Sequence, residues 1–277
     1  MLKHIALAAL LTLGFSTATL GQQSHATGSS NHVSTMTKGA FAGPEAERAL
    51  ARLGDLSLPA VRERLAQLRP PAYLPGPVLI NKIIEQQHLP VASSDRVSRL
   101  KAALRPVLAY HGRDQMPVIV ARSEQPKAYL VERAAIIITT NMMLITSEAE
   151  MRGIIAHELA HECLWDERAR ARKEDDQSWL REIELFCDAV AAITLKEIGD
   201  DPADYARALE RLTSVGITAG NATRHESKTH PSLDARLKLN QWLCQRLGST
   251  SVIAPRGEQR CSLGKSSSRL ADQYHVD

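Results

Sequence analysis

Apolar residues recur every three or four positions over most of the chain from residue 44 onward, a spacing typical of helices with one buried face. Pro59 falls in the first turn of its segment, where proline is favourable. Pro106 lies inside another segment, and we expect it to kink or end that helix because proline removes a backbone donor. The helices predicted in this way are Ala46–Leu53, Pro59–Leu68, Val78–Gln87, Ser94–Tyr110, Trp179–Ile198, Pro202–Leu212 and Ser232–Leu247.

A further helix is predicted from Ser147 onward, with Ser147 as its N-cap and Glu150 as the capping-box partner. This helix contains the pattern H-E-x-x-H at His157, Glu158 and His161. Positions four residues apart share one face of a helix, so the two imidazoles can bind one Zn²⁺ while Glu158 acts as a general base toward water. The alternative interpretation is a surface helix that carries two histidines by chance.

The predicted helix Trp179–Ile198 offers carboxylates for a third zinc ligand, which a catalytic zinc site requires. Glu184 and Asp188 are four residues apart and therefore share a face. This spacing permits Glu184 to bind zinc while Asp188 accepts a hydrogen bond from a liganding histidine. Glu182 is the competing candidate for the third ligand.

Three segments of the chain resemble, in order, sequence blocks of the gluzincin endopeptidases. The relevant branch of that family holds the HtpX heat-shock protease and the BepA, Oma and CAAX prenyl proteases. The segments are Met151–Glu162, Glu184–Asp188 and His230–Arg236, and the family blocks read roughly H-E-x-x-H, E-x-x-A-D and H-P-x-x-x-x-R. The resemblance spans about residues 95 to 240.

This resemblance implies that Glu184 is the third zinc ligand and that Asp188 is its supporting carboxylate. It further implies that His230 lies near the open coordination position, where it would stabilise the tetrahedral intermediate or cap the zinc at rest. Arg236 would help to orient the site. Where the family block usually has alanine this chain has Cys187, and we expect that difference to touch no proposed ligand.

Upstream of the H-E-x-x-H helix, three segments resemble the short strands that precede the zinc-binding helix in this family. The implied fold class is α+β and mainly helical, a zincin-like domain with a small β-sheet before the zinc-binding helix. We expect the last strand to offer an edge to which a peptide substrate adds as an extra strand. The short connection from His161 to Glu184 leaves no room for a membrane-spanning hairpin. The three strand segments are Pro117–Arg122, Lys127–Val131 and Ala135–Thr140.

Residues 1–21 fit a secretory signal peptide, because Lys3 precedes the apolar run Ile5–Phe15 and small residues follow it. The run is too short to span a bilayer, and an uncleaved anchor is the alternative. Export to the periplasm is therefore predicted, with full secretion as the alternative. We predict a flexible linker at residues 22–43, a zincin-like metallopeptidase domain at 44–248 and a polar C-terminal tail at 249–277.

The 34 basic and 31 acidic residues give a net charge of +3, which indicates neither nucleic acid nor an anionic membrane as a partner. Four cysteines in an exported chain can form disulfides, and we favour a bridge between Cys244 and Cys261, which flank a short loop. Cys163 and Cys187 could pair or could each be a small buried side chain. The mixed-charge run 167–176 is predicted to be a solvated face or loop.

Together these features predict an exported zinc endopeptidase, with one Zn²⁺ per chain, that hydrolyses peptide bonds of unfolded or extended polypeptides. The gluzincin resemblance implies a role in envelope protein quality control. The alternative is a latched, chaperone-like or binding protein in which His230 caps the metal. A purely structural zinc domain is a weaker alternative, because a closed site has no use for Glu158. The oligomeric state is left open.

Overall fold

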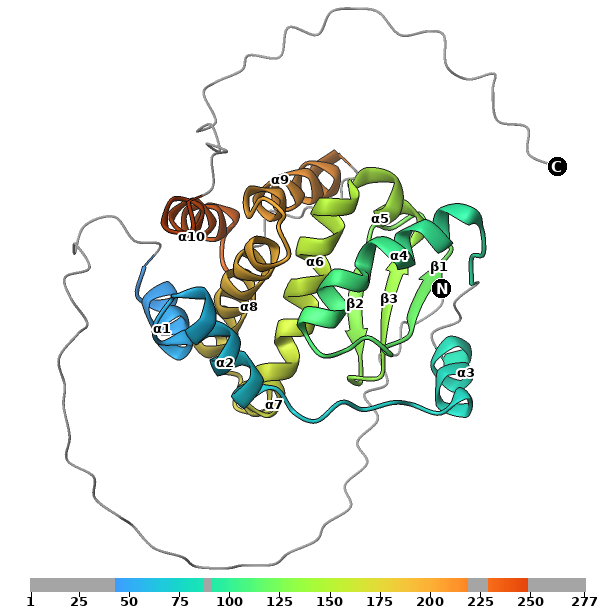
Figure 1. Cartoon of the computed structure of the whole chain (residues 1–277), viewed down its shortest axis with the longest axis horizontal. Helices are drawn as coiled ribbons and strands as arrows, with labels where there is room; N and C mark the ends of the chain where they lie inside the picture. The colour runs from blue at the N-terminus through green and yellow to red at the C-terminus, as the bar shows by residue number, and fades with distance from the viewer. Residues whose placement is uncertain (1–42, 87–90, 219–228, 249–277) are drawn as a thin grey trace, which may run out of the picture. The chain divides into compact units, whose positions relative to one another are not determined.

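The computed structural model describes residues 43–86, 91–218 and 229–248, which lie in one compact unit of the chain (Figure 1). The predicted signal peptide, the linker up to residue 42, the tail from residue 249 and Cys261 lie outside the described residues. The helices are α1 (Pro44–Leu53), α2 (Leu58–Leu68), α3 (Pro77–Gln86), α4 (Asp95–Tyr110), α5 (Thr140–Ile145), α6 (Glu148–Ala160), α7 (Trp165–Lys173), α8 (Gln177–Glu197), α9 (Ala203–Thr218) and α10 (Leu233–Arg246), and the 3₁₀ turn His161–Leu164 joins α6 to α7.

The sheet holds three strands, β1 (Val118–Ala121), β2 (Ala128–Val131) and β3 (Ala135–Thr139), in the spatial order β1-β3-β2. β3 runs parallel to β1 and antiparallel to β2. The prediction that the last strand offers an edge is therefore wrong, because β3 is paired on both sides. Its uninterrupted burial explains this position, since a strand that is covered on both faces belongs in the interior of a sheet.

Alternate residues of the strands pack on opposite faces of the sheet, as the pleat requires. Val118, Val120, Ile136 and Ile138 join the core that the sheet shares with α4 and α6. Their neighbours Ile119 and Ile137 pack against Ile83 of α3 on the other face. In Figure 1 α6 lies between the sheet and the helices α8 and α9. The α+β, mainly helical fold with a small sheet before the central helix is confirmed.

The start of α6 carries the predicted capping box. The backbone N–H of Glu150 donates to Ser147 Oγ over 3.2 Å, and the N–H of Ser147 donates to the Glu150 carboxylate over 2.7 Å. These bonds satisfy two backbone donors that a helix start leaves without partners, so the position of α6 along the chain is encoded locally.

The structure narrows two local predictions. α4 continues past Pro106 to Tyr110, so the proline does not end the helix. Pro106 lies on the exposed face of α4. The first part of the run 167–176 forms most of α7, and most of the run is exposed, which agrees with a solvated face.

A close approach between α6 and α9 occurs at Gly153. A Cβ added there would lie 3.0 Å from the Cβ of Tyr205 and 3.2 Å from a methyl carbon of Leu195. Only glycine accommodates α9 at this distance without movement of a neighbour. The contact brings the buried Tyr205 side chain toward the C-terminal half of α6.

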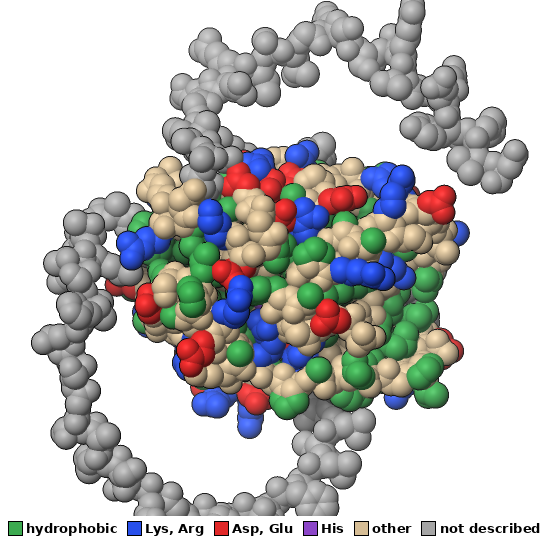
Figure 2. All heavy atoms as spheres, viewed as in Figure 1, with side chains coloured by type: hydrophobic (Ala, Val, Ile, Leu, Met, Phe, Trp, Pro, Cys, Tyr) green, Lys and Arg blue, Asp and Glu red, His purple; other side chains and the backbone are tan. Residues whose placement is uncertain are grey.

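Basic and acidic side chains are interspersed over the face in Figure 2, with no extensive patch of one sign. Among the residues that the structure describes, no helix has both the length and the apolar character needed to cross a bilayer.

Candidate metal centre

The H-E-x-x-H residues lie at the C-terminal end of α6 and the start of the following 3₁₀ turn. Both histidines are buried, with 6% of His157 and 2% of His161 exposed, and their rings approach edge to face with centroids 4.9 Å apart. Ligand atoms of His157, Glu158 and His161 all lie within 4.8 Å of one another. The predicted pair of imidazoles on one face is therefore present.

Glu184 of α8 brings a carboxylate to the same point. Its Oε2 lies 3.4 Å from His157 Nε2, and its Oε1 lies 3.7 Å from His161 Nε2. Ligand atoms about 2.0–2.1 Å from a tetrahedral zinc are separated from one another by about 3.3–3.4 Å. The two nitrogens and the carboxylate therefore fit a zinc ion with only small side-chain adjustments.

Glu182, the competing candidate, faces away from this site. Its carboxylate accepts from Arg48 Nε over 2.7 Å and from Arg52 Nε over 2.6 Å, so it joins α8 to α1. The separation follows from helical geometry, because residues two apart point to nearly opposite sides of a helix.

Asp188 is fully buried one turn beyond Glu184 and contacts both a histidine and an arginine. Its Oδ1 lies 3.0 Å from His157 Nδ1, and Arg236 of α10 donates to its two oxygens over 2.8 and 2.6 Å. Burial by itself would favour the neutral acid, but the Arg236 guanidinium holds the pKa of Asp188 well below its usual range. The carboxylate is thus kept ionised and can orient the His157 ring.

The hydroxyl of Tyr205 completes this network, and the sequence analysis missed it. Tyr205 Oη donates to Asp188 Oδ1 over 2.6 Å, accepts from Arg236 Nη2 over 2.8 Å and lies 2.9 Å from His157 Nδ1. No sequence motif marks Tyr205. The only available signal was a phenol on the predicted helix Pro202–Leu212, which does not distinguish it from an ordinary core residue.

Burial and these contacts act oppositely on the two histidines. For His157 burial disfavours the cation, but the hydrogen bonds to Asp188 and Glu184 outweigh it and raise the pKa to about 9. For His161 burial dominates and lowers the pKa well below its usual range. His161 is therefore neutral and ready to bind a metal, whereas binding at His157 displaces a proton.

Cys187 touches the other ring nitrogen of His161, with Sγ 3.2 Å from Nδ1. This departure from the family block replaces no proposed ligand, as expected, but it places a thiol against the ring of one of them. Of the two alternatives for Cys163 and Cys187, the structure shows the small buried side chain, because both cysteines are free and buried. The favoured bridge from Cys244 involves Cys261, which lies outside the described residues.

Glu158 lies at the border between α6 and the sheet. Its carboxylate is hydrogen-bonded by the backbone of Leu130 in β2, and burial raises its pKa. A raised pKa suits a carboxylate that must accept a proton and return it. β2 is an edge strand of the sheet and contacts α6. The edge of β2 that faces away from β3 therefore lies close to Glu158.

Two further basic side chains border the site. His230 is half exposed, with Nε2 3.8 Å from Glu184 Oε2 and Nδ1 3.0 Å from Thr229 Oγ1. Arg168 of α7 has Nη2 3.5 Å from Glu184 Oε1. The sequence analysis named His230 from the family resemblance, but it did not name Arg168, because it took the charged run as solvated.

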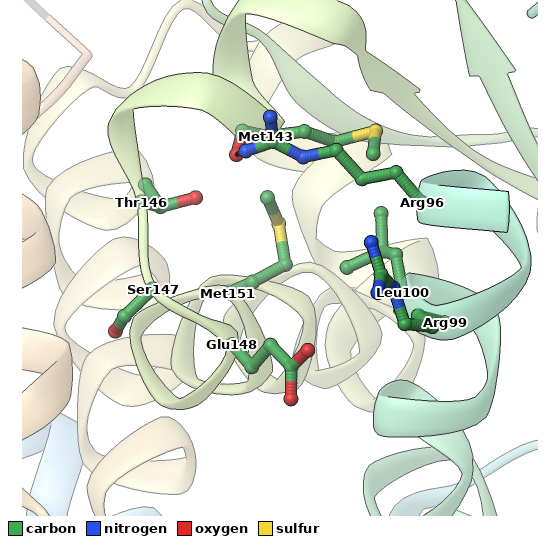
Figure 3. Close-up of a pocket in the computed structure, with 8 residues that line it drawn as sticks. All are labelled: Arg96, Arg99, Leu100, Met143, Thr146, Ser147, Glu148 and Met151. Atoms are coloured by element: carbon green, nitrogen blue, oxygen red, sulfur yellow. Dashed lines mark hydrogen bonds between the residues drawn. The ribbon is translucent and has the colours of Figure 1, made fainter. Parts of the chain in front are cut away.

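A separate pocket of about 360 Å³ lies at the opposite end of α6 (Figure 3). Its floor includes Leu100 and Met151, and Arg96 and Glu148 belong to its rim. The ten residues from Ser147 to His157 correspond to about 15 Å of helix. This pocket is therefore not part of the candidate metal centre.

A zincin-like fold with two histidines, a carboxylate and an adjacent glutamate at one point defines the class of metal-dependent hydrolases. Residues 94–173 match the family model of peptidase family M48, a gluzincin family of H-E-x-x-H metallopeptidases that use zinc. The resemblance drawn from the sequence is confirmed, and the match indicates a metallopeptidase with a polypeptide substrate. The matched residues include the H-E-x-x-H helix and end before Glu184. A search of curated proteins found no match.

Proposed function

We propose that the chain is an exported zinc endopeptidase that cleaves unfolded or extended polypeptides. The observation that carries the proposal is the convergence of His157, His161 and Glu184 on one point, with Glu158 beside it and β2 next to Glu158. His157, His161 and Glu184 would hold one zinc ion per chain, and this arrangement leaves a coordination position open for water or substrate.

When bound, zinc supplies a Lewis acid that lowers the pKa of water and polarises the peptide carbonyl. Glu158 accepts the proton of the attacking water and later delivers it to the leaving amine nitrogen. Asp188 and Tyr205 hold Nδ1 of His157, so that Nε2 points toward Glu184. Arg236 neutralises Asp188 and keeps it in place.

The free side of β2 is where we propose that the substrate binds. An extended peptide that adds to β2 as a fourth strand would pass beside Glu158, which is bonded to the backbone of Leu130. Backbone pairing selects extended, unfolded chains over folded ones. A proline scan across a cleaved peptide should therefore show strong losses at alternate positions, and a flat scan would contradict strand addition.

Export to the periplasm, with full secretion as the alternative, is supported by the charged start and the short apolar run of residues 1–21. A role in envelope protein quality control is an analogy with the gluzincin branch. N-terminal sequencing of the protein recovered from the periplasm tests export, and a mature start near residue 22 is expected. Recovery of the full-length chain in the membrane fraction would favour the uncleaved anchor.

A second candidate function has an observation of its own in the position of His230. Its Nε2 is 3.8 Å from the candidate ligand Glu184, close enough for the imidazole to become a fourth ligand after a small movement. In that case the site is latched and the protein binds polypeptides without cleaving them. His230→Ala should raise activity if His230 is a latch. If His230 instead stabilises the tetrahedral intermediate, the variant should lose activity and keep its zinc.

The first experiment measures zinc content together with cleavage of casein, for the wild type and for Glu158→Gln. We expect one zinc ion per chain in both proteins and cleavage only in the wild type. Zinc without cleavage in either protein would favour the latched function. Absence of stoichiometric zinc in the wild type would refute both functions.

A further inference from the structure

Arg168 and Arg172 of α7 form a pair of basic side chains beside the candidate metal centre. Arg168 lies 3.5 Å from Glu184 and has 22% of its side chain exposed. Arg172 follows four residues later and therefore shares a face of α7 with Arg168. Partial burial lowers the pKa of Arg172, the like charge of Arg168 lowers it further, and the negative charge of Glu184 opposes both effects. None of the three family blocks includes either residue.

Two of the carboxylates of this region are already engaged elsewhere. Glu167 pairs with Arg52 over 2.6 Å, and Asp176 accepts from the backbone N–H of Trp179 over 2.9 Å as the N-cap of α8. Among the residues that the structure describes, Glu184 is the one carboxylate paired with Arg168, and Arg172 has no ion pair there. The two arginines repel each other across one helical turn, and the charge of Glu184 compensates for part of this repulsion.

Glu184 is an incomplete partner for Arg168. Their 3.5 Å separation is longer than the about 2.7–2.9 Å of a good charged hydrogen bond, and both oxygens of Glu184 also face the histidines. With zinc bound, Glu184 and Glu158 balance the two charges of the ion, and Arg236 balances Asp188. The charges of Arg168 and Arg172 are then in excess.

We propose that Arg168 and Arg172 bind a carboxylate of the polypeptide substrate and make the enzyme selective for an acidic group near the cleaved bond. The inference rests on the proposed peptidase function. A guanidinium group presents paired donors that match a carboxylate, and the negative charge relieves the repulsion within the pair. The carboxylate comes from an acidic side chain or from the free C-terminus of the peptide.

Four matched peptides test this selectivity. They share one sequence and carry either Glu or Gln beside the cleaved bond, each with a free or an amidated C-terminus. For the wild type we expect kcat/KM about tenfold higher for the preferred carboxylate than for its neutral counterpart, as for one charge-assisted hydrogen bond. If kcat/KM is higher for the Glu than for the Gln peptides, the carboxylate is an acidic side chain. If it is higher for the free than for the amidated peptides, the carboxylate is the C-terminus.

Arg168→Gln and Arg172→Gln should each bring this ratio close to one, and Arg168→Glu should invert it in favour of a Lys peptide. Lys173→Gln is the matched control, because it removes one positive charge from an exposed position of the same helix and should keep the wild-type ratio. Zinc content is measured for every variant. A wild-type ratio near one, or a ratio that survives Arg168→Gln, would overturn the proposal.

A binding measurement separates this proposal from the peptidase function. Fluorescence anisotropy gives the Kd of the same peptides for zinc-loaded Glu158→Gln, with and without Arg168→Gln. If the wild type cleaves no peptide but Arg168 still selects the carboxylate peptide, the carboxylate site stands and the peptidase function fails. If the wild type cleaves both members of each pair equally and the Kd values do not differ, only the carboxylate site is refuted.

Discussion

Replacing Tyr205 with phenylalanine removes a single hydroxyl from the centre of the network behind the candidate metal centre. That hydroxyl donates to Asp188 over 2.6 Å, accepts from Arg236 over 2.8 Å and lies 2.9 Å from His157 Nδ1. Asp188 and Arg236 keep two direct bonds to each other, so the substitution leaves no buried charge without a partner. The ring itself, which is 1% exposed, keeps its packing.

The expected cost follows from the bonds that are lost. Hydrogen bonds to charged groups contribute about 1.5–3 kcal/mol each, and the remaining bonds compensate for part of the loss. We therefore expect Tyr205→Phe to lower the free energy of unfolding of the metal-free protein by about 2 kcal/mol. Because Asp188 still holds His157, zinc affinity should fall by about tenfold, the low end of the range for such supporting groups.

Urea unfolding of the metal-free protein measures the first effect, and competition with a chelator measures the second. Tyr129→Phe is the control, since Tyr129 is only partly buried and lies among apolar residues on the α3 side of the sheet. Ordinary surface substitutions change the free energy of unfolding by less than about 0.5 kcal/mol. If Tyr205→Phe lowers it by no more than that and leaves zinc affinity unchanged, the structural role of the hydroxyl is refuted.

Three further predictions concern packing and the metal. Gly153→Ala should lower the thermal midpoint, because its Cβ would meet Tyr205 at 3.0 Å and overpacking costs about 1–3 kcal/mol; a higher midpoint would show that helix propensity prevails. Glu184→Gln should abolish stoichiometric zinc in elemental analysis. Glu182→Gln should keep the zinc and lose only the stabilisation from its ion pairs with Arg48 and Arg52. The reverse result would make Glu182 the third ligand. Zinc at about a thousand times its Kd should raise the free energy of unfolding by about 4 kcal/mol, and a chelator should reverse this gain. If zinc does not change the free energy of unfolding of His157→Ala, the effect arises at this site.

Zinc affinity is expected to depend less on the sulfur of Cys187 than on the carboxylate of Asp188. The two candidate histidines are supported differently, because His157 has Asp188 and Tyr205 at Nδ1 whereas His161 has a thiol. Sulfur is a weak hydrogen-bond partner, so the His161 ring is oriented less firmly by this contact. Its surroundings hold it instead, because Glu162 accepts from Arg113 Nε over 2.8 Å and fixes the turn that His161 begins.

The sequence alone determined the features that depend on neighbours along the chain. The capping box at Ser147 and Glu150, the shared face of His157 and His161, and the alignment of Glu184 with Asp188 all follow from helical geometry within one or two turns. The third block pointed to His230 and Arg236 through the family resemblance, and in the structure these residues lie beside Glu184 and Asp188 respectively. A resemblance carries tertiary information that helical spacing does not.

Only the tertiary structure decided which side chains from separate elements meet. Tyr205 joins the network because Gly153 allows α9 to approach α6, and Arg168 reaches Glu184 because α7 turns back toward α8. The order of the strands was equally beyond the sequence pattern, since an apolar run such as β3 is compatible with either an edge or a central position until its partners are known. Local spacing sets which residues share a face, whereas long-range packing sets what that face contacts.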